Sequence, residues 1–246
     1  MPAETKKPKP DYGVDAPKVV RIFFLLGAAA LLGGLALAKF GPRSLLMASL
    51  IGTGIVGGSI WMATAGLMFF GSKVLKVRLR ERLLDGIPWR GDERVLDVGC
   101  GRGLMLIGAA KRLTHGSGVG VDLWQTEDQS GNDPETTRAN AFAEGVSGRV
   151  EIKTGDARQL PFEANHFDAV LSSWALHNIY DRAGREQALR EIARVLKPGG
   201  RVVLVDIRHA REYAEGLKQA GLADVQTSRP NFIFVIPSRV VTGRKV

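Results

Sequence analysis

The sequence predicts an α/β protein in which a doubly wound sheet of seven strands follows two membrane-spanning helices. Three observations support this fold class. Beyond residue 92, apolar runs typical of buried strands alternate with helix-prone segments. The first of these runs, Val95–Val98, leads directly into the glycine-rich turn Gly99–Gly103. Two long apolar stretches occupy much of the first 70 residues, and the chain of 246 residues has room for one ordinary domain and an appendage.

The chain begins with a polar segment. Residues 1–18 contain four prolines and few large apolar side chains. Such a composition cannot bury enough apolar surface to offset the entropy of ordering the chain. We therefore expect residues 1–18 to form a disordered cytosolic tail.

Two apolar stretches come next. Residues 22–38 carry no charge, and Leu45–Phe70 is a run of 26 residues without a charged side chain. At about 1.5 Å per residue, the second stretch is long enough to cross roughly 30 Å of hydrocarbon. We expect a two-helix transmembrane hairpin over residues 19–71, broken at Gly41-Pro42. The first stretch alone also fits a signal-peptide core, but no clear cleavage site follows it and a second span comes almost at once.

The basic residues around these stretches predict their orientation. Five basic residues precede the first stretch and five follow the second closely, whereas the connecting loop has only Lys39 and Arg43. The positive-inside bias then predicts an integral membrane protein with both termini and the α/β domain in the cytosol. Gly54 and Gly58 have a small-xxx-small spacing, which either packs the two spans together or pairs two chains. The sequence thus leaves a monomer and a homodimer open.

The rest of the chain divides into a linker and the α/β domain. Residues 72–91 are expected to be a basic juxtamembrane helix and linker, which lies at the membrane surface or caps the α/β domain. The α/β domain itself is expected over residues 92–246, closing with an antiparallel hairpin after its fifth strand. Strands are expected at 94–98, 118–122, 149–153, 167–173, 201–207, 223–228 and 232–236, and helices at 103–113, 134–145, 185–196 and 210–220.

Charge and cysteine content limit the classes of partner. The net charge is +9, and residues 71–246 carry 27 basic and 22 acidic side chains. This modest surplus suits attraction to anionic lipid headgroups, and no dense run of Arg and Lys interleaved with aromatic residues favours nucleic acid. Cys100 is the single cysteine, so an internal disulfide and a thiolate metal cluster are excluded. No group of residues has metal-ligand spacing, and we expect a metal-free site.

Four motifs occur in order along the α/β domain. They are the strand and turn at 95–103, Gly118–Asp122 placed 25 residues after Asp97, Gly155–Phe162, and Arg194–Arg201. In this order and spacing they resemble the class I S-adenosylmethionine-dependent methyltransferases, especially the branch that methylates small molecules and lipid quinones. The resemblance covers roughly residues 75–246. It implies a Rossmann-like methyltransferase sheet and S-adenosyl-L-methionine as the cofactor.

The resemblance also implies a cofactor site at the carboxyl ends of the strands. The glycine turn would expose bare backbone to the methionine part of the cofactor. Asp97 would hold either the turn or the cofactor's amino group, Asp122 would accept hydrogen bonds from the ribose hydroxyls, and Asp156 would meet the adenine. Turn or capping chemistry is the alternative for Asp97 and Asp156. The expected cofactor-binding residues are Asp97, Gly99, Gly101, Gly103, Asp122, Leu123, Asp156, Ala157 and Ser172.

A nicotinamide dinucleotide site is the alternative explanation of the glycine turn. Its fingerprint is G-x-G-x-x-G. Here the glycines are Gly99, Gly101 and Gly103, and Leu104 stands where the third glycine is required. This spacing argues against a dehydrogenase.

Substrate-side residues are expected after the fourth strand, in the segment Ser172–Tyr180. This segment lacks the Asn/Asp-Pro-Pro-aromatic signature of many enzymes that methylate nucleobases or amide nitrogen. His177 is the candidate general base, because histidine titrates near neutral pH; a local hydrogen-bonding role is the alternative. The polar loop 124–133 is either a lid or a solvated loop. Weaker candidates are Trp174, Asn178, Tyr180 and Asp206.

Together these observations predict a membrane-anchored methyltransferase. Its acceptor would be small and hydrophobic or membrane-associated, such as a quinone precursor, an isoprenoid or a lipid. A methyltransferase for a membrane protein is one alternative. A non-catalytic, cofactor-binding regulatory module is the other.

Overall fold

The computed structural model describes residues 8–125, 132–233 and 235–246. Its N-terminal part consists of α1 (Pro17–Phe40), α2 (Leu45–Phe70), the π-helical turn η1 (Gly71–Leu75) and α3 (Lys76–Asp85). The α/β part consists of β1 (Arg94–Val98), α4 (Leu104–Ala110), β2 (Ser117–Asp122), α5 (Pro134–Ala143), η2 (Ser147–Arg149), β3 (Val150–Thr154), β4 (Phe167–Ser173), η3 (Leu176–Asn178), α6 (Arg182–Val195), β5 (Leu196–Asp206), α7 (Ala210–Gln219), β6 (Leu222–Thr227) and β7 (Arg239–Lys245).

The seven strands form one mixed sheet in the order β3-β2-β1-β4-β5-β7-β6. The first five are parallel, and β7 runs antiparallel between β5 and β6. The doubly wound sheet of seven strands and its closing antiparallel hairpin are therefore confirmed. The strand order reverses between β1 and β4, which is the point where open α/β sheets place their ligands.

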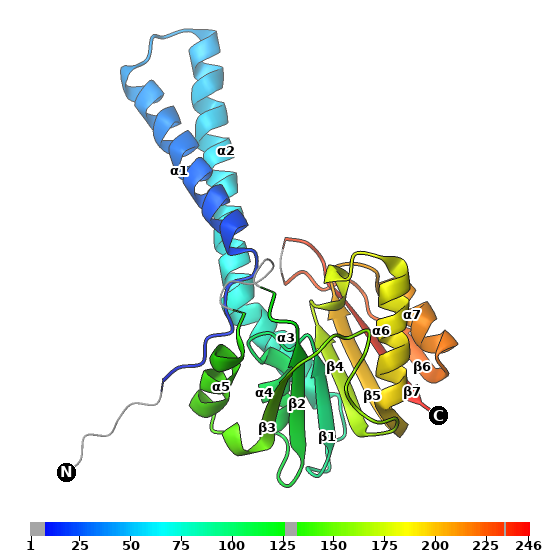
Figure 1. The fold of residues 1–246 in the computed structure, drawn as a ribbon. Helices are drawn as coiled ribbons and strands as arrows, with labels where there is room; N and C mark the ends of the chain where they lie inside the picture. Colours follow the sequence, from blue (N-terminus) through cyan, green and yellow to red (C-terminus); the bar gives the residue numbers. More distant parts are fainter. Residues whose placement is uncertain (1–7, 126–131, 234) are drawn as a thin grey trace, which may run out of the picture.

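Helices cover both faces of the sheet (Figure 1). On one face α6 and α7 bury Leu189 and Leu217 against Val170 of β4 and Leu204 of β5. On the other face α3 and α4 pack against the alternate side chains of the same strands. The central strands β1 and β4 are thus buried on both faces, which explains their nearly continuous apolar sequences.

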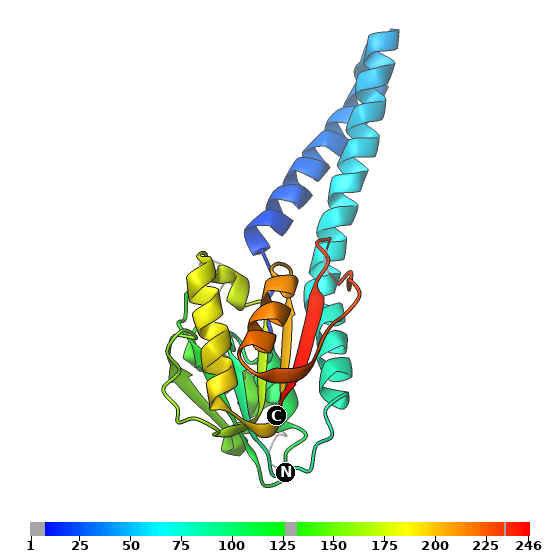
Figure 2. The ribbon, with the colours of Figure 1, turned by 90° about the vertical axis from the view of Figure 1, so that its right-hand side faces the viewer.

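Helices α1 and α2 form a hairpin that projects from one end of the α/β domain (Figures 1 and 2). Glycines allow the two helices to approach closely: a Cβ on Gly58 would lie 2.6 Å from the carbonyl oxygen of Gly27, and one on Gly54 would lie 2.9 Å from the carbonyl oxygen of Ala30. Of the two roles expected for Gly54 and Gly58, the structure shows packing within the hairpin. Large apolar side chains such as Leu32 and Val56 cover the outer faces and are exposed.

Helix α2 continues through η1 into α3, so that residues 45–85 form one unbroken helix. Leu79 and Leu84 of α3 are buried against Met105 of α4. Gly108 lets the two helices meet, because a Cβ there would lie 2.7 Å from the Leu84 side chain. Of the two placements expected for the segment after residue 72, the structure therefore shows the one that caps the α/β domain.

The expectation of a disordered tail is wrong for residues 8–16, which pack on the domain. The backbone N–H of Asp11 donates to Oδ1 of Asn140 (2.8 Å), and the N–H of Asp15 donates to Oγ of Ser72 (3.0 Å). Tyr12 is buried. The hydrogen-bond partners of Asp11, Tyr12 and Asp15 lie 57 to 132 residues away in the chain. Composition alone therefore did not reveal these contacts. Residues 1–7 of the expected tail lie outside the described residues.

The last strand is also displaced from its expected position. Residues 232–236 were expected to form it, but β7 is Arg239–Lys245, and the described part of 232–236 lies in the loop before it. The apolar run is explained by Ile233, which packs against the α3 and α4 face of the sheet. Strand β5 also begins five residues earlier than expected, at Leu196.

Candidate functional site

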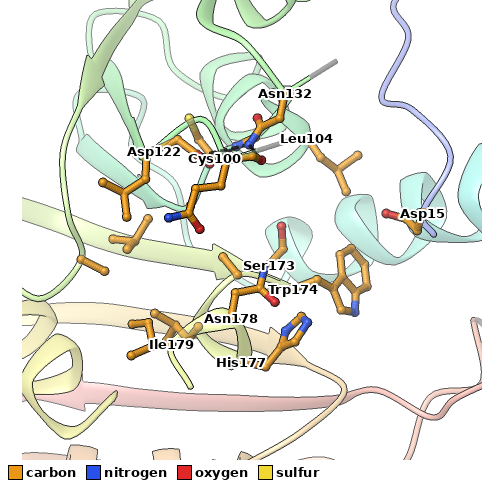
Figure 3. Close-up of a pocket in the computed structure, with 18 of the residues that line it drawn as sticks. Asp15, Cys100, Leu104, Asp122, Asn132, Ser173, Trp174, His177, Asn178 and Ile179 are labelled. Carbon is orange, nitrogen blue, oxygen red and sulfur yellow. Dashed lines mark hydrogen bonds between the residues drawn. The ribbon is translucent and has the colours of Figure 1, made fainter. Parts of the chain in front are cut away.

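A cavity of about 610 Å³ lies at the carboxyl ends of the parallel strands (Figure 3). Its volume falls in the range of roughly 300–1,000 Å³ that is typical of small-molecule sites. One wall comes from the turn after β1 and the end of β2, and the opposite wall from the segment after β4. The cavity also extends to the foot of the hairpin, where Asp15, Ala16, Met68 and Lys76 line it.

The turn after β1 places bare backbone along the cavity. Gly99, Gly101 and Gly103 all have positive φ, at +70°, +49° and +82°. Gly99 and Gly101 line the cavity, whereas Gly103 begins α4 and is not part of the lining. A Cβ on Gly99 would lie 2.1 Å from Cβ of Ala175. Glycine is therefore required here both by the backbone conformation and by the close segment after β4.

Asp97 precedes this turn in β1 and is bonded to the helix that follows the turn. Its Oδ2 accepts from the backbone N–H of Leu106 (2.8 Å), and its Oδ1 has no partner among the described residues. The carboxyl is fully buried, and this burial raises its pKa to about 7. Asp97 is not part of the cavity lining, and its hydrogen bond to Leu106 holds the first turn of α4.

Asp122 stands at the end of β2 and faces the cavity. Its Oδ2 accepts from the N–H of Gly101 (2.8 Å), and its Oδ1 accepts from the N–H of Trp124 (2.7 Å) and Nδ2 of Asn132 (3.2 Å). A carboxylate has about four acceptor positions, and the bonds from the described residues leave one on Oδ2 for a ligand. The carboxylate thus joins the glycine turn to the loop after β2.

Asn132 was missed by the sequence reasoning. Its Nδ2 also donates to the carbonyl oxygen of Gln125 (3.0 Å), which fixes the amide. Its Oδ1 is buried and has no hydrogen-bond partner within the described chain, although Asn132 lines the cavity. A buried, unpaired acceptor beside a binding cavity suits a ligand that brings a donor. The only signal in the sequence was the position of Asn132 in the polar loop 124–133, of which residues 126–131 lie outside the described part.

Not all of the remaining expected cofactor-binding residues line the cavity. Leu123, Asp156 and Ala157 line the cavity. Arg158 holds the Asp156 carboxylate through Nε, at 3.0 Å from each oxygen, and this pairing lowers the pKa of Asp156. Ser172 is buried and does not line the cavity, whereas Ser173 does. Successive strand residues point to opposite faces, so Ser173 lines the cavity and Ser172 does not.

His177 lies on the opposite wall, in η3, next to a buried carboxylate. Its Nδ1 is 2.6 Å from Oδ1 of Asp206, a short contact that is not aligned as a hydrogen bond. Asp206 ends β5, and its Oδ2 accepts from the backbone N–H of His177 (3.1 Å) and from the hydroxyl of Tyr213 (3.1 Å). These bonds fix the carboxylate on the Nδ1 side, which leaves Nε2 as the nitrogen available to a ligand.

The other substrate-side candidates line the same wall. Trp174 has a φ of +49°, and its Nε1 donates to Oγ of Ser238 (2.9 Å), which ties the wall to the loop before β7. Asn178 and Tyr180 also line the cavity, and the Tyr180 side chain is largely exposed at its edge. Figure 3 shows Trp174, His177 and Asn178 together across the cavity from Asp122 and Cys100.

Lys76 is a second residue that sequence reasoning missed. It is almost fully buried, and its Nζ donates to the carbonyl oxygens of Tyr12 (2.8 Å) and Gly13 (3.3 Å) and to Oδ2 of Asp15 (2.9 Å). Burial lowers the pKa of Lys76, and the Asp15 carboxylate opposes this shift. The ammonium therefore fastens the segment before α1 to the helix that enters the domain.

No group of three potential metal ligands occurs among the described residues. Cys100 is buried in the cavity wall, and burial raises the pKa of its thiol well above the ordinary value. The thiolate is the reactive form of cysteine, so the side chain acts here as a small apolar group. Gly120 makes room for it, since a Cβ there would lie 2.7 Å from Sγ.

Comparison with known proteins identifies this region. Residues 96–204 match the family model described as "Methyltransferase domain". The chain is 34% identical over 132 residues to the 27-O-demethylrifamycin SV methyltransferase of Amycolatopsis mediterranei, covering 52% of this chain and 44% of that protein. It is 36% identical over 122 residues to the ubiquinone/menaquinone biosynthesis C-methyltransferase of Pseudomonas fluorescens, covering 48% and 43%. The chain thus spans less than half the length of these curated relatives.

Solved structures share the fold. Phosphoethanolamine N-methyltransferase 2 of Haemonchus contortus, solved in complex with S-adenosyl-L-methionine, superposes with a TM-score of 0.56. The two are 19% identical, and the match covers 71% of this chain and 53% of that one. At this identity the similarity concerns the fold alone.

Proposed function

We propose that this chain, whose residues 96–204 are a methyltransferase domain, transfers a methyl group from S-adenosyl-L-methionine to an apolar acceptor at a membrane surface. One observation carries the proposal. A single cavity joins the glycine turn and Asp122 to Met68 at the foot of an exposed, apolar helical hairpin. A polar cofactor and an apolar acceptor can therefore meet in one space.

The residues around the turn fit the cofactor. Gly99 and Gly101 offer backbone without side chains, and the free acceptor position of Asp122 suits a ribose hydroxyl. The unpaired Oδ1 of Asn132 gives a second acceptor close to that carboxylate. When bound, S-adenosylmethionine supplies a methyl group on a positively charged sulfur. After the transfer this sulfur is the neutral thioether of S-adenosylhomocysteine.

His177 is the group that would take a proton from the acceptor. Its Nε2 accepts the proton as the acceptor's nucleophilic atom bonds to the methyl carbon, and the imidazolium formed is stabilised by the carboxylate of Asp206. Nδ1 lies 2.6 Å from the carboxylate without an aligned hydrogen bond, and catalytic hydrogen bonds often become aligned only when a ligand binds. The segment after β4 otherwise aligns the acceptor.

The hairpin supplies the membrane anchor. Its helices are 24 and 26 residues long, and only 11% and 6% of their most apolar windows are buried. A core helix of a soluble protein would be mostly buried. The apolar side chains of these two helices are instead exposed, which is unfavourable in water. The hydrocarbon interior of a bilayer would surround these apolar side chains. The basic flanks favour a cytosolic α/β domain, where S-adenosylmethionine is available.

The class of acceptor follows from this placement and from the relatives. A quinone methyltransferase and a macrocycle methyltransferase are among the proteins to which the chain is similar. The cavity is lined by Met68, Val235 and Ile236 on its hairpin side. Such a lining favours an acceptor with an apolar body, in the manner of an isoprenoid quinone precursor.

A transfer assay tests the proposal. Purified full-length protein in nanodiscs is incubated with methyl-labelled S-adenosylmethionine and native membranes, and the label is then measured in organic, aqueous and protein fractions. Label in the organic fraction supports an apolar acceptor. Label confined to the protein fraction, even after subtraction of self-methylation, would replace it with a membrane-protein acceptor. Cofactor binding without label in any fraction would reject catalysis and favour a regulatory module.

A further inference from the structure

The loop between β6 and β7 carries apolar side chains that the fold leaves uncovered. Phe232, Val235 and Ile236 are 71%, 48% and 54% exposed. Three large apolar side chains within five positions are unusual on a surface that faces water only. These three residues are called the apolar tip below.

The structure holds the apolar tip firmly in place. Asn231 and Ser238 exchange backbone hydrogen bonds of 2.7 and 2.9 Å across the base of the loop. Ile233 is buried against the α3 and α4 face of the sheet. The hydroxyl of Ser238 accepts from Nε1 of Trp174. The tip is therefore displayed by an anchored loop and is not the end of a loose segment.

The position of the loop brings the apolar tip to the membrane side of the domain. Arg239 pairs with Asp206 in the sheet, so the loop leaves the sheet at the edge that holds the cavity. In Figures 1 and 2 the loop, coloured orange to red, lies beside the lower part of the α2–α3 helix, at the end of the domain from which the hairpin projects. Val235 and Ile236 line the same cavity as Met68 of α2.

The charges around the apolar tip suit an anionic lipid surface. Arg229 and Arg239 flank the loop, and both are exposed. Basic residues beside exposed apolar side chains are the pattern of interfacial membrane contacts, because they meet the headgroups while the apolar groups enter the hydrocarbon boundary. The occupant that fits both features is a phospholipid bilayer.

We infer that the apolar tip inserts into the bilayer leaflet that the hairpin enters, and that the opening between the tip and Met68 admits the acceptor laterally from that leaflet. The inference rests on the proposed function, because it requires the hairpin to be in a membrane. It adds a second membrane contact and a direction of entry. An acceptor that enters in this way keeps its apolar body in lipid or protein until it reaches the segment after β4.

Depth-dependent fluorescence quenching in nanodiscs tests the inference. The full chain is prepared with one added cysteine, at Ile236→Cys in the tip, Ser59→Cys in the middle of α2, or Ser147→Cys before β3. Ser147 is exposed and precedes the amino end of a parallel strand, which places it at the edge of the sheet away from the cavity. Each cysteine is labelled with an environment-sensitive dye. The parent chain is the labelling control, since Cys100 is buried.

The nanodiscs contain phosphatidylcholine and phosphatidylglycerol with a nitroxide either near the headgroup or near the end of the acyl chain. We expect the dye at position 59 to be quenched most by the deep nitroxide, the dye at 236 by the shallow one, and the dye at 147 by neither. Quenching at 59 without quenching at 236 would overturn the inference and leave the anchor standing. No quenching at 59 would reject the anchor and, with it, the inference. Equal quenching at 147 and 236 would also overturn it, because the domain would then lie on the membrane without a preferred face.

A matched pair of substitutions strengthens the test. Phe232→Ser removes the most exposed side chain of the tip without touching the cavity lining, and Phe142→Ser removes a comparably exposed phenylalanine (62%) from α5. With the dye at position 236, Phe232→Ser should reduce shallow quenching at least twofold, because burial of a phenylalanine is a large share of the membrane affinity of so small a contact. Phe142→Ser should leave the quenching unchanged. The same loss in both variants would contradict a specific role for the tip.

Discussion

Nδ1 of His177 lies 2.6 Å from Oδ1 of Asp206, and this carboxylate also accepts from the backbone N–H of His177 and from the hydroxyl of Tyr213. These two donors hold the carboxylate in place against Nδ1 of His177. The other nitrogen is then the only proton acceptor of the ring on the cavity side.

His177→Ala should lower kcat by about 10²–10⁴-fold, the usual contribution of a general base. The affinity for S-adenosylmethionine should change little, because His177 lies across the cavity from the glycine turn. Steady-state kinetics and calorimetric titration separate the two effects. His115→Ala, at an exposed histidine, is the matched control. Unchanged turnover of His177→Ala would reduce the residue to a local structural role.

Asp122→Ala should weaken cofactor binding by about 10–100-fold, because a hydrogen bond to a charged group contributes roughly 1.5–3 kcal/mol. The change also frees the N–H groups of Gly101 and Trp124. Isothermal titration with S-adenosylhomocysteine measures the affinity, and Asp92→Ala at an exposed position controls for loss of charge. Equal affinities of Asp122→Ala and the parent would remove Asp122 from the site.

The buried carboxyl of Asp97 predicts a pH-dependent stability. Its pKa is about 7 in the fold and about 3.9 in an unfolded chain, so the fold favours the neutral acid. Its contribution is complete below about pH 4 and is lost as the pH rises to about 7, a change of roughly 4 kcal/mol.

Asp97→Asn removes this titration. Thermal unfolding of the full chain in detergent, followed between about pH 5 and about pH 8, should show the Tm of the parent falling relative to that of the variant. A constant gap between the two Tm values would show that Asp97 does not titrate in this range.

Lys76→Met should release the segment before α1, because three oxygen atoms on Tyr12, Gly13 and Asp15 would lose their buried donor. Removal of one partner from a buried ion pair costs about 3–5 kcal/mol. Hydrogen exchange at residues 11–16 should become faster. Lys73→Met, which removes a more exposed ion pair with Asp11, should cost about 1 kcal/mol or less. Equal exchange rates in the two variants would argue that Lys76 does not hold residues 12–15 on the domain.

Two adjacent glycines of α2 provide a test of the hairpin. A Cβ on Gly58 would lie 2.6 Å from the carbonyl oxygen of Gly27, whereas no atom lies within 4 Å of one on Gly57. Gly58→Leu should therefore separate α1 from α2 and lower the Tm in detergent, and Gly57→Leu should not. If Gly57→Leu alone were harmful, that face would be paired with another molecule.

The elements that the sequence predicted well are those with local signals. Strands such as Phe167–Ser173 are largely apolar runs. The turn Gly99–Gly103 is recognisable because three of its five residues are glycine. Asp122 could be placed because it is the last residue of a strand. Each of these features depends on residues within a few positions of one another.

The features that sequence reasoning missed depend on distant partners. In the sequence Lys76 is one of several basic residues after a long apolar stretch, and only the fold brings Tyr12 and Asp15 around it. Asn132 belongs to a polar loop, and the periodicity of the sequence does not show which residue of such a loop lines the cavity. The run at 232–236 satisfies every local rule for a strand, but the sheet pairs Arg239–Lys245 with β5 instead.

The unbroken helix over residues 45–85 connects the hairpin to the α/β domain without a flexible linker. Each residue added to or removed from an α-helix turns everything beyond it by about 100° and moves it by about 1.5 Å. The π-helical turn Gly71–Leu75 is itself equivalent to one added residue. The number of residues between Phe70 and Lys76 therefore sets the rotation of the cavity about the axis of the hairpin. If the hairpin spans a membrane as proposed, deletion of one residue there would keep the side chains of the α/β domain and turn the cavity to a different side of the hairpin.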